Sequence, residues 1–181
     1  FIDLSERNAV QSRLEAVQAE ALIDPLTGIA NRRLFDSKIF ARLTEVAAGG
    51  LGFGLILADV DHFKSFNDQH GHATGDVVLR TVAQTISHCC RNFDLVARWG
   101  GEEFAVLAGG TPADVRRQAE QIRVLVEQSH ARTPTGPLSI TLSLGATLAR
   151  AGDTPEILFA RTDALLYQSK SAGRNRATVD F

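Results

Sequence analysis

Apolar residues follow two periods along this chain, and the order in which the periods alternate predicts its secondary structure. Residues 73–90 place Val78, Val82 and Ile86 four residues apart, which indicates a helix with one apolar face. Residues 52–60 form an apolar run that ends in carboxylates, which is typical of a buried central strand. Residues 138–149 alternate at first between apolar and polar, so that strand would keep one face in water. The predicted helices are 31–47, 73–90, 112–130 and 154–172, and the predicted strands are 52–60, 93–99, 103–108 and 138–149.

These segments run in the order βαββαβ after two leading helices, the first of which is 4–23, and they end with a helix. The order predicts a ferredoxin-like α+β fold with a central antiparallel sheet, extended at its edges, and helices packed on one face. The chain has 181 residues, of which 44% are hydrophobic and 22% charged. These values suit one compact domain with a short appendage.

The leading helix carries apolar residues at the spacings of a coiled-coil seam, namely Val10, Leu14, Val17 and Ala21. They make only about two heptads, so a helix that lies on the domain is an alternative to a stalk. The break at Asp24-Pro25 favours the stalk and divides the chain into a linker helix, 1–23, and a domain, 24–181. Because the chain begins with Phe1 and contains no methionine, we expect an upstream sensor domain in a longer protein.

Charge and apolar run length exclude two classes of protein. The net charge of −2 argues against a general nucleic-acid binder, which needs a basic surface, but it does not exclude a mononucleotide ligand. The longest apolar stretch, 51–58, is far below the roughly 20 residues that span a bilayer. Cys89 and Cys90 are adjacent and lack the spacing of a zinc site. We expect a cytoplasmic domain with reduced cysteines, whose parent protein can still be membrane-anchored.

Acidic residues gather at the ends of two predicted strands. Gly100-Gly101 reads as the tip of a β-hairpin, and Glu102 and Glu103 follow it directly. Asp59 ends the buried strand, and Asp61 comes two residues later. If the two strands are neighbours, Asp59 and Glu102 converge and offer the hard oxygens that suit Mg²⁺. A solvated acidic loop is the alternative.

Basic residues indicate where phosphate would bind. The chain contains no Gly-x-x-x-x-Gly-Lys-Ser/Thr and therefore no P-loop. Residues 61–67 instead turn from strand to helix, where backbone N–H groups can hold phosphates and Lys64 adds charge. Lys170 and Arg174 are four residues apart and would share one face of the last helix, unless that face is simply solvated.

Residues 98–104, Arg-Trp-Gly-Gly-Glu-Glu-Phe, resemble the signature of GGDEF-domain diguanylate cyclases in its GGEEF form. Trp99 stands where tyrosine is frequent in the family, and Ser169 where alanine is frequent. The resemblance implies a palm-type fold similar to nucleotide cyclase catalytic domains. Four further segments resemble motifs of the same family in compatible order, namely 24–32, 59–68, 71–76 and 164–175.

The resemblance implies an enzyme that condenses two GTP into cyclic di-GMP and releases two pyrophosphates, with Mg²⁺ or Mn²⁺ as the cofactor. The matching metal ligands are the Asp59 carboxylate, the Val60 main-chain carbonyl and Glu102. Glu102 would also help to deprotonate the attacking 3′-hydroxyl, and Glu103 would be a second acidic contributor. Catalysis would take place in a homodimer that holds one GTP in each copy.

The family's substrate contacts match polar and aromatic residues on both sides of this acidic cluster. Asn67 and Asp76 match guanine-contacting positions, and a carboxylate suits the N1–H and N2–H donors that adenine lacks. Without the family, Asp76 is an ordinary acid at a helix N-terminus, and His72 a surface histidine. The full predicted set is Phe63, Lys64, Asn67, His72, Asp76, Lys170 and Arg174.

Arg91 and Asp94 form an Arg-x-x-Asp motif. The motif ends five residues before Gly100, and this position matches the inhibitory site of the family. An arginine fork can bind phosphate and guanine edges, so the resemblance implies product inhibition by cyclic di-GMP. A salt bridge at a helix end is the alternative.

Two other functions stay open. A non-catalytic receptor would bind GTP or cyclic di-GMP and signal through partners, and a related cyclase or polymerase would use another nucleotide. Asp59, Glu102 and Glu103 favour catalysis, because degenerate domains of this kind usually lose the acidic hairpin residues. Asn67 together with Asp76 favours guanine.

Overall fold

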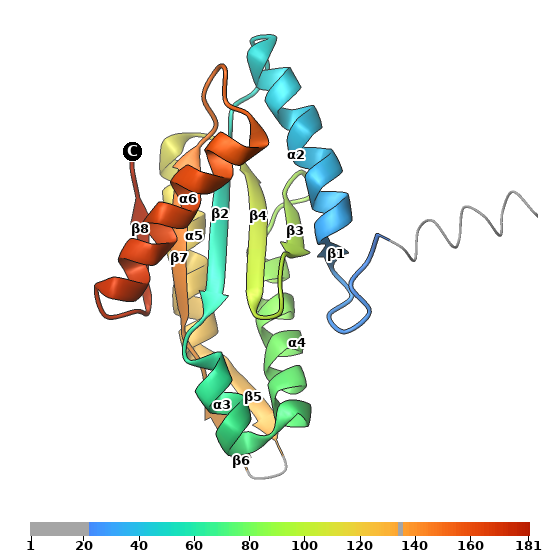
Figure 1. The fold of residues 1–181 in the computed structure, drawn as a ribbon, viewed down its shortest axis with the longest axis vertical. Helices are drawn as coiled ribbons and strands as arrows, with labels where there is room; N and C mark the ends of the chain where they lie inside the picture. Colours follow the sequence, from blue (N-terminus) through green and yellow to red (C-terminus); the bar gives the residue numbers. More distant parts are fainter. Residues whose placement is uncertain (1–21, 134–135) are drawn as a thin grey trace, which may run out of the picture.

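A six-stranded sheet forms the centre of the molecule, whose computed structural model describes residues 22–133 and 136–181. The strands lie in the order β1-β3-β4-β2-β7-β8 (Figure 1). The four central strands pair antiparallel, which confirms the predicted antiparallel core of an α+β fold. In their order across the sheet, the six strands are Ala30–Asn31, Leu95–Arg98, Glu103–Gly109, Phe53–Val60, Leu142–Leu148 and Arg176–Val179.

Two short edge strands extend this core by parallel pairing, so the whole sheet is mixed. β1 pairs with β3 and β8 pairs with β7. A parallel neighbour needs a crossover connection instead of a tight turn. For β7 and β8 the crossover contains α6, Pro155–Ser171. β8 follows too closely on that helix, and is too short, for its own sequence pattern to predict a strand.

Helices cover both faces of the sheet, which corrects the expectation that they pack on one face (Figure 1). α4 and α5 lie on one face, and α2 and α6 on the other. Besides α6, their bounds are Arg32–Ala47 for α2, His72–Cys89 for α4 and Pro112–Gln128 for α5.

The central strand β2 explains why two helical layers are needed. Ile56 and Ala58 belong to the hydrophobic cluster under α4 and α5, whereas Leu55 and Leu57 belong to the cluster under α2 and α6. Every residue of β2 is buried. A strand that is apolar on both faces is stable only when each face is covered.

Three local features differ from the predicted elements. A separate helix, α3 (Phe63–His70), follows β2 and ends at Gly71, whose φ is 82°. The predicted strand 138–149 is divided into β7 and β6 (Gly136–Ser139), and β6 pairs with β5 (His130–Thr133) in a small hairpin. At the N-terminus, Ile23 makes an isolated bridge instead of continuing a helix.

The remainder of the predicted leading helix lies outside the described residues. Across the ranges that the structure does describe, no helix is both long and apolar enough to cross a membrane.

Candidate active site

The end of β2 and the β3–β4 turn lie side by side next to α3 (Figure 1). Asp59 is opposite Glu103 in the antiparallel register, and the Val60 N–H donates to the Glu102 carbonyl oxygen at 3.2 Å. The Trp99 N–H closes the turn by donating to the Glu103 carbonyl oxygen at 2.8 Å. The predicted neighbourhood of Asp59 and Glu102 is therefore present.

Burial raises the pKa of the two carboxylates at this end of the sheet, and neighbouring negative charges add to the rise. Asp59 is 7% exposed, and burial raises its pKa, although a hydrogen bond from Lys170 opposes the rise. Burial also raises the pKa of Glu102, and the negative charges of Asp59 and Glu103 raise it further. Desolvated carboxylates that repel one another favour a bound proton or a bound cation. The site therefore attracts positive charge.

Lys170 and Arg174 bring positive charge to Asp59. Lys170 Nζ lies 2.9 Å from Asp59 Oδ2, and the charge of Arg174 also lowers the pKa of Asp59. The two do not share a helix face as predicted, because α6 ends at Ser171 and Arg174 follows in a turn with a left-handed φ of 63°. The turn nevertheless keeps Arg174 near Asp59.

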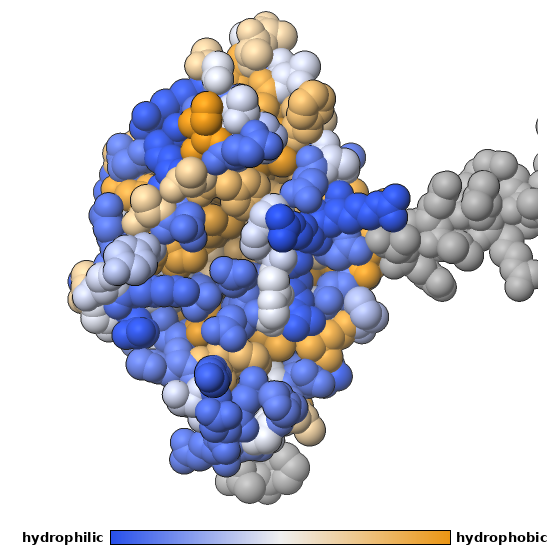
Figure 2. Space-filling view, in the orientation of Figure 1, coloured by the Kyte–Doolittle hydropathy of each residue, from blue (hydrophilic) through white to orange (hydrophobic). Residues whose placement is uncertain are grey.

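A cavity of about 450 Å³ is lined by residues of α3, α4 and the β3–β4 turn. Figure 2 shows mostly hydrophilic residues over the lower half of this face, where α3 and the end of β2 lie. α3 begins without a side-chain cap from His62, so its first N–H groups remain available to an anion. Five predicted substrate residues line the cavity together with Glu102, namely Phe63, Lys64, Asn67, His72 and Asp76.

Asn67, which lines this cavity, carries an unsatisfied acceptor. Its Oδ1 is buried and has no hydrogen-bond partner within the described part of the chain. Such atoms are rare in folded proteins because an unpaired buried acceptor is costly. Asp76 lines the same cavity. An amide oxygen together with a carboxylate suits a ligand edge that carries neighbouring N–H donors.

Glu103 lies apart from the cavity that Glu102 lines. It lines a second cavity of about 260 Å³ together with Trp99, Phe159 and Asp163. Glu102 lies in the turn, whereas Glu103 is the first residue of β4, so strand geometry determines the direction of the Glu103 side chain alone. The role of Glu103 as a second acidic contributor stays a prediction, although its charge does raise the pKa of Glu102.

Arg98 and Asp24 hold the β3–β4 turn, a role that the sequence did not predict. Arg98 donates from Nε and Nη2 to the Gly101 carbonyl oxygen at 3.2 and 2.7 Å. Its Nη1 lies 3.2 Å from Asp24 Oδ1. Burial alone would raise the pKa of Asp24, but hydrogen bonds from Thr27 and the charge of Arg98 lower it overall. Both residues stand in motifs that carry the family resemblance, and their presence there was the signal in the sequence that could have indicated a role.

The acidic residues fit a metal ion that takes most of its ligands from elsewhere. In the described ranges, no three His, Cys, Asp or Glu side chains gather closely enough to enclose an ion. Mg²⁺ often binds one or two carboxylates and completes its shell with water and substrate phosphates. Asp59, Glu102 and the Val60 carbonyl would form an all-oxygen set of that kind.

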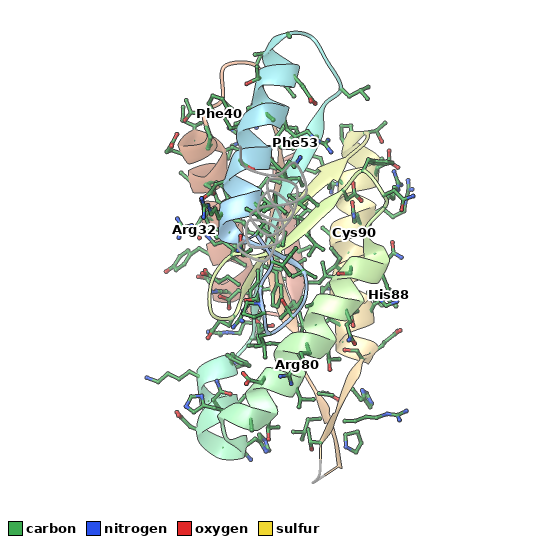
Figure 3. All side chains as sticks on the ribbon, turned by 90° about the vertical axis from the view of Figure 1, so that its right-hand side faces the viewer. Arg32, Phe40, Phe53, Arg80, His88 and Cys90 are labelled. Carbon is green, nitrogen blue, oxygen red and sulfur yellow. The ribbon has the colours of Figure 1, made fainter. Side chains whose placement is uncertain are left out.

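The predicted product site lies at the other end of α4 from the cavity. His72 and Asp76 belong to the first turns of the helix, whereas Arg91 follows its C-cap residue Cys90, which Figure 3 labels. The helix has 18 residues and is therefore about 27 Å long. Any communication between the two places must cross that distance.

The Asp94 carboxylate is occupied by hydrogen bonds within the protein, whereas the Arg91 side chain is accessible to solvent. Asp94 accepts hydrogen bonds from the Arg91 N–H at 2.8 Å, the Gly109 N–H at 2.9 Å and Gln118 Nε2 at 2.9 Å. The Arg91 side chain is half exposed, and its Nη2 lies 3.6 Å from Asp114 Oδ1. A salt bridge at the end of α4, the alternative considered from the sequence, is therefore present, with Asp114 as the partner of Arg91.

The family model for "Diguanylate cyclase, GGDEF domain" matches residues 21–176. Diguanylate cyclase VdcA of Vibrio cholerae is 38% identical over 175 residues, which cover 94% of this chain and 50% of VdcA. Response regulator PleD of Caulobacter vibrioides is 40% identical, over 93% of this chain and 37% of PleD. The chain thus spans half or less of these curated relatives.

A solved structure covers almost the whole chain. The coiled coil and GGDEF domain of DgcB from Caulobacter crescentus, in complex with c-di-GMP, has a TM-score of 0.92 and 36% identity to this chain. The match covers 97% of this chain and 94% of that one.

Proposed function

The chain belongs to the GGDEF-domain family of diguanylate cyclases, and we propose that it condenses two molecules of GTP into cyclic di-GMP with release of two pyrophosphates. The observation that carries this proposal is the meeting of Asp59 and Glu102 beside a cavity lined by Asn67, whose buried Oδ1 has no hydrogen-bond partner among the described residues. A nucleotide whose base fills that cavity would extend its phosphates toward the acidic end of β2.

Asp59, Glu102 and the Val60 carbonyl would hold the Mg²⁺ or Mn²⁺ ions. When bound, such ions lower the pKa of a ribose 3′-hydroxyl and offset the charge of a leaving pyrophosphate. Glu102 is suited to accept the proton of the attacking hydroxyl, because its raised pKa makes its oxygens more basic than those of an ordinary glutamate.

Guanine selectivity would come from Asn67 and Asp76. The Asn67 Oδ1 and the Asp76 carboxylate can accept from the N2–H and N1–H groups of guanine, and adenine would leave both acceptors unpaired. Lys64, Lys170 and Arg174 would neutralise the triphosphate, helped by the uncapped first turn of α3.

Each copy would hold one GTP, so turnover requires two copies with their sites face to face. A stalk formed by residues 1–23 would raise the effective concentration of that encounter, and the likeness to the coiled coil and GGDEF domain of DgcB supports this arrangement. Arg91, which is half exposed, would bind cyclic di-GMP as an inhibitor, with Asp94 holding the backbone of its loop.

One observation favours the alternative of a non-catalytic receptor. Lys170 already neutralises Asp59 at 2.9 Å, so a cation at this carboxylate has to compete with an internal ammonium group. Catalysis therefore requires that Lys170 transfers its contact to the substrate phosphates.

The test is to incubate the purified 181-residue chain with GTP and MgCl₂ and to separate the products by chromatography. We expect cyclic di-GMP and pyrophosphate, with little product from ATP. Asp59→Ala and Glu102→Ala should each lower turnover at least about 100-fold, because charge stabilisation by a bound metal is worth several kcal/mol. Asp36→Ala removes an exposed carboxylate of α2 and should turn over like the wild type.

The outcomes separate the two functions. Binding of GTP without product would support the receptor. A folded chain that binds neither GTP nor cyclic di-GMP would contradict both.

A further inference from the structure

Asp61 is a buried carboxylate that accepts hydrogen bonds from other parts of the chain. It is 7% exposed. Its Oδ1 accepts from Ser143 Oγ at 2.6 Å, and its Oδ2 accepts from Thr141 Oγ1 at 2.7 Å and from the Asn175 N–H at 3.0 Å. Three donors from two distant segments therefore converge on one side chain, and Oδ2 has both lone pairs in use.

The segment that contains Asn175 is strained. Gly173, Arg174 and Asn175 have φ values of 111°, 63° and 45°. Non-glycine residues rarely adopt this left-handed conformation, and it persists only where the surroundings impose it. Here it carries the chain from the end of α6 into β8, and it determines where the Arg174 side chain begins.

Several contacts impose that conformation. The Arg174 N–H donates to the Ser169 carbonyl oxygen at 3.0 Å. The Asn175 side chain accepts from Arg123 Nη1 at 3.0 Å and donates to Glu127 Oε1 at 2.8 Å, both on α5. Asp61 adds the contact that ties the turn to the end of β2, where Asp59 and Val60 lie. Among the described residues it makes the one hydrogen bond between this turn and the segment that follows the predicted metal ligands.

Arg174 is equipped to bind an anion at this place. Its charge lowers the pKa of Asp59, so the guanidinium is near that carboxylate. Among the described residues the guanidinium makes no hydrogen bond or ion pair of its own; the bonds of Arg174 come from its backbone. A guanidinium that makes no hydrogen bond or ion pair among the described residues, beside the acidic end of β2, fits a substrate phosphate.

We propose that Asp61 is a positioning residue, which sets Arg174 at a fixed place relative to Asp59 by anchoring the turn at 173–175. The inference rests on the proposed function, since Arg174 is taken as a triphosphate ligand. It assigns Asp61 no contact with metal or substrate, although Asp61 is only two residues from Asp59.

An asparagine at position 61 distinguishes this role from metal binding. Its amide oxygen can accept from Thr141 and from the Asn175 N–H, and its amide nitrogen can donate to the Ser143 hydroxyl. Asp61→Asn therefore keeps every anchoring contact and loses only the charge. Asp61→Ala loses the contacts as well.

The experiment measures binding of guanosine 5′-[α,β-methylene]triphosphate with Mg²⁺ by titration calorimetry. This analogue cannot react at the bond that the cyclase would break. Arg174→Ala should weaken binding about tenfold, as expected for a lost charged hydrogen bond. Asp61→Ala should raise the Kd about fivefold to tenfold, and Asp61→Asn should stay within about threefold of the wild type.

Because Asp61 acts through Arg174, the double variant Asp61→Ala/Arg174→Ala should bind no more than about twofold more weakly than Arg174→Ala alone. Asp153→Ala is the matched control, since the Asp153 carboxylate is largely buried, with its side chain 7% exposed, and pairs with Arg161. It should lower the Tm and leave the Kd unchanged. If Asp61→Ala does not fold, Asn175→Ala loosens the same turn and should show the same non-additivity with Arg174→Ala.

Losses that multiply in the double variant would overturn the inference, and so would wild-type binding by Asp61→Ala. An Asp61→Asn variant that turns over GTP as slowly as Asp59→Ala would also overturn it, because the negative charge of Asp61 would then be needed for catalysis. A wild-type chain that does not bind the analogue contradicts the proposed function instead.

Discussion

Gly75 shows how one residue prepares the substrate cavity. It lies inside α4, where glycine is usually unfavourable, and its backbone is helical. A Cβ at this position would lie 1.9 Å from Asn67 Oδ1 and 3.1 Å from Phe63 Cζ. Glycine is therefore needed for space, because it lets the Asn67 amide pack directly against α4 beside the cavity.

Gly75→Ala should lower guanine selectivity with little effect on folding. The added methyl meets the end of a flexible side chain, so Asn67 rotates away, and alanine should offset any strain by the usual gain of about 0.5–1 kcal/mol in a helix. We expect the kcat/KM ratio of GTP over ITP, which lacks the 2-amino group, to fall about fivefold.

Thr74→Ala changes the preceding residue of the same helix and should leave that ratio unchanged. An unaltered preference for GTP in Gly75→Ala would show that Asn67 does not bind the 2-amino group.

At the scale of elements, the β3–β4 hairpin depends on a contact from outside itself. The Trp99 and Gly100 N–H groups both donate to the Glu103 carbonyl oxygen and close the turn. Arg98 then joins the Gly101 carbonyl oxygen to Asp24 in the loop that precedes β1. The turn that carries Glu102 is thus held from two sides.

Arg98→Ala should reduce kcat about tenfold while the chain stays folded, since a misplaced catalytic group loses part of the benefit of its orientation. Arg98→Lys should not restore activity, because one ammonium group cannot reproduce contacts that use three guanidinium nitrogens. The measurement is steady-state turnover of GTP.

Arg32→Ala is the control for that prediction. Arg32 lies over the Trp99 ring at 4.2 Å but makes none of the described hydrogen bonds that hold the turn, so its loss should leave kcat near the wild-type value. Full activity in Arg98→Ala would mean that the turn keeps its shape without this contact.

At the scale of the whole molecule, stability depends on how closely α6 approaches the sheet. A Cβ at Gly145 of β7 would lie 2.3 Å from the Leu166 nitrogen and 2.5 Å from the Thr162 carbonyl oxygen. Both are backbone atoms of α6 and cannot rotate away. The helix that carries Lys170 therefore packs on bare backbone.

Gly145→Ala should lower the free energy of unfolding by about 3 kcal/mol, because overpacking here has to move a whole helix. Chemical denaturation measures the change. Gly52→Ala, where a Cβ would meet nothing within 4 Å, is the control and should change stability little. A loss as small as that of the control would mean that α6 shifts without cost.

Local patterns predicted much of this fold and of its site. The hairpin, the buried strand ending at Asp59 and the helices α2, α4, α5 and α6 depend on periodicity and turn residues within a few positions of one another. Strand pairing then followed from the element order, and it brought Asp59 and Glu102 together as expected. Most of the substrate residues were predicted through family resemblance, and five of them line one cavity.

The sequence by itself determined which elements form and which acidic residues end them, because those properties depend on neighbouring residues. Only the tertiary structure decided that helices cover both faces, that Arg174 leaves the helix, and that Asp61 faces inward. Each of these depends on contacts between residues far apart in the chain, such as Asp61 and Asn175, separated by 114 positions. The spacing of apolar residues along a short segment cannot predict such a contact, because the contact forms only when the whole sheet and its helices have assembled.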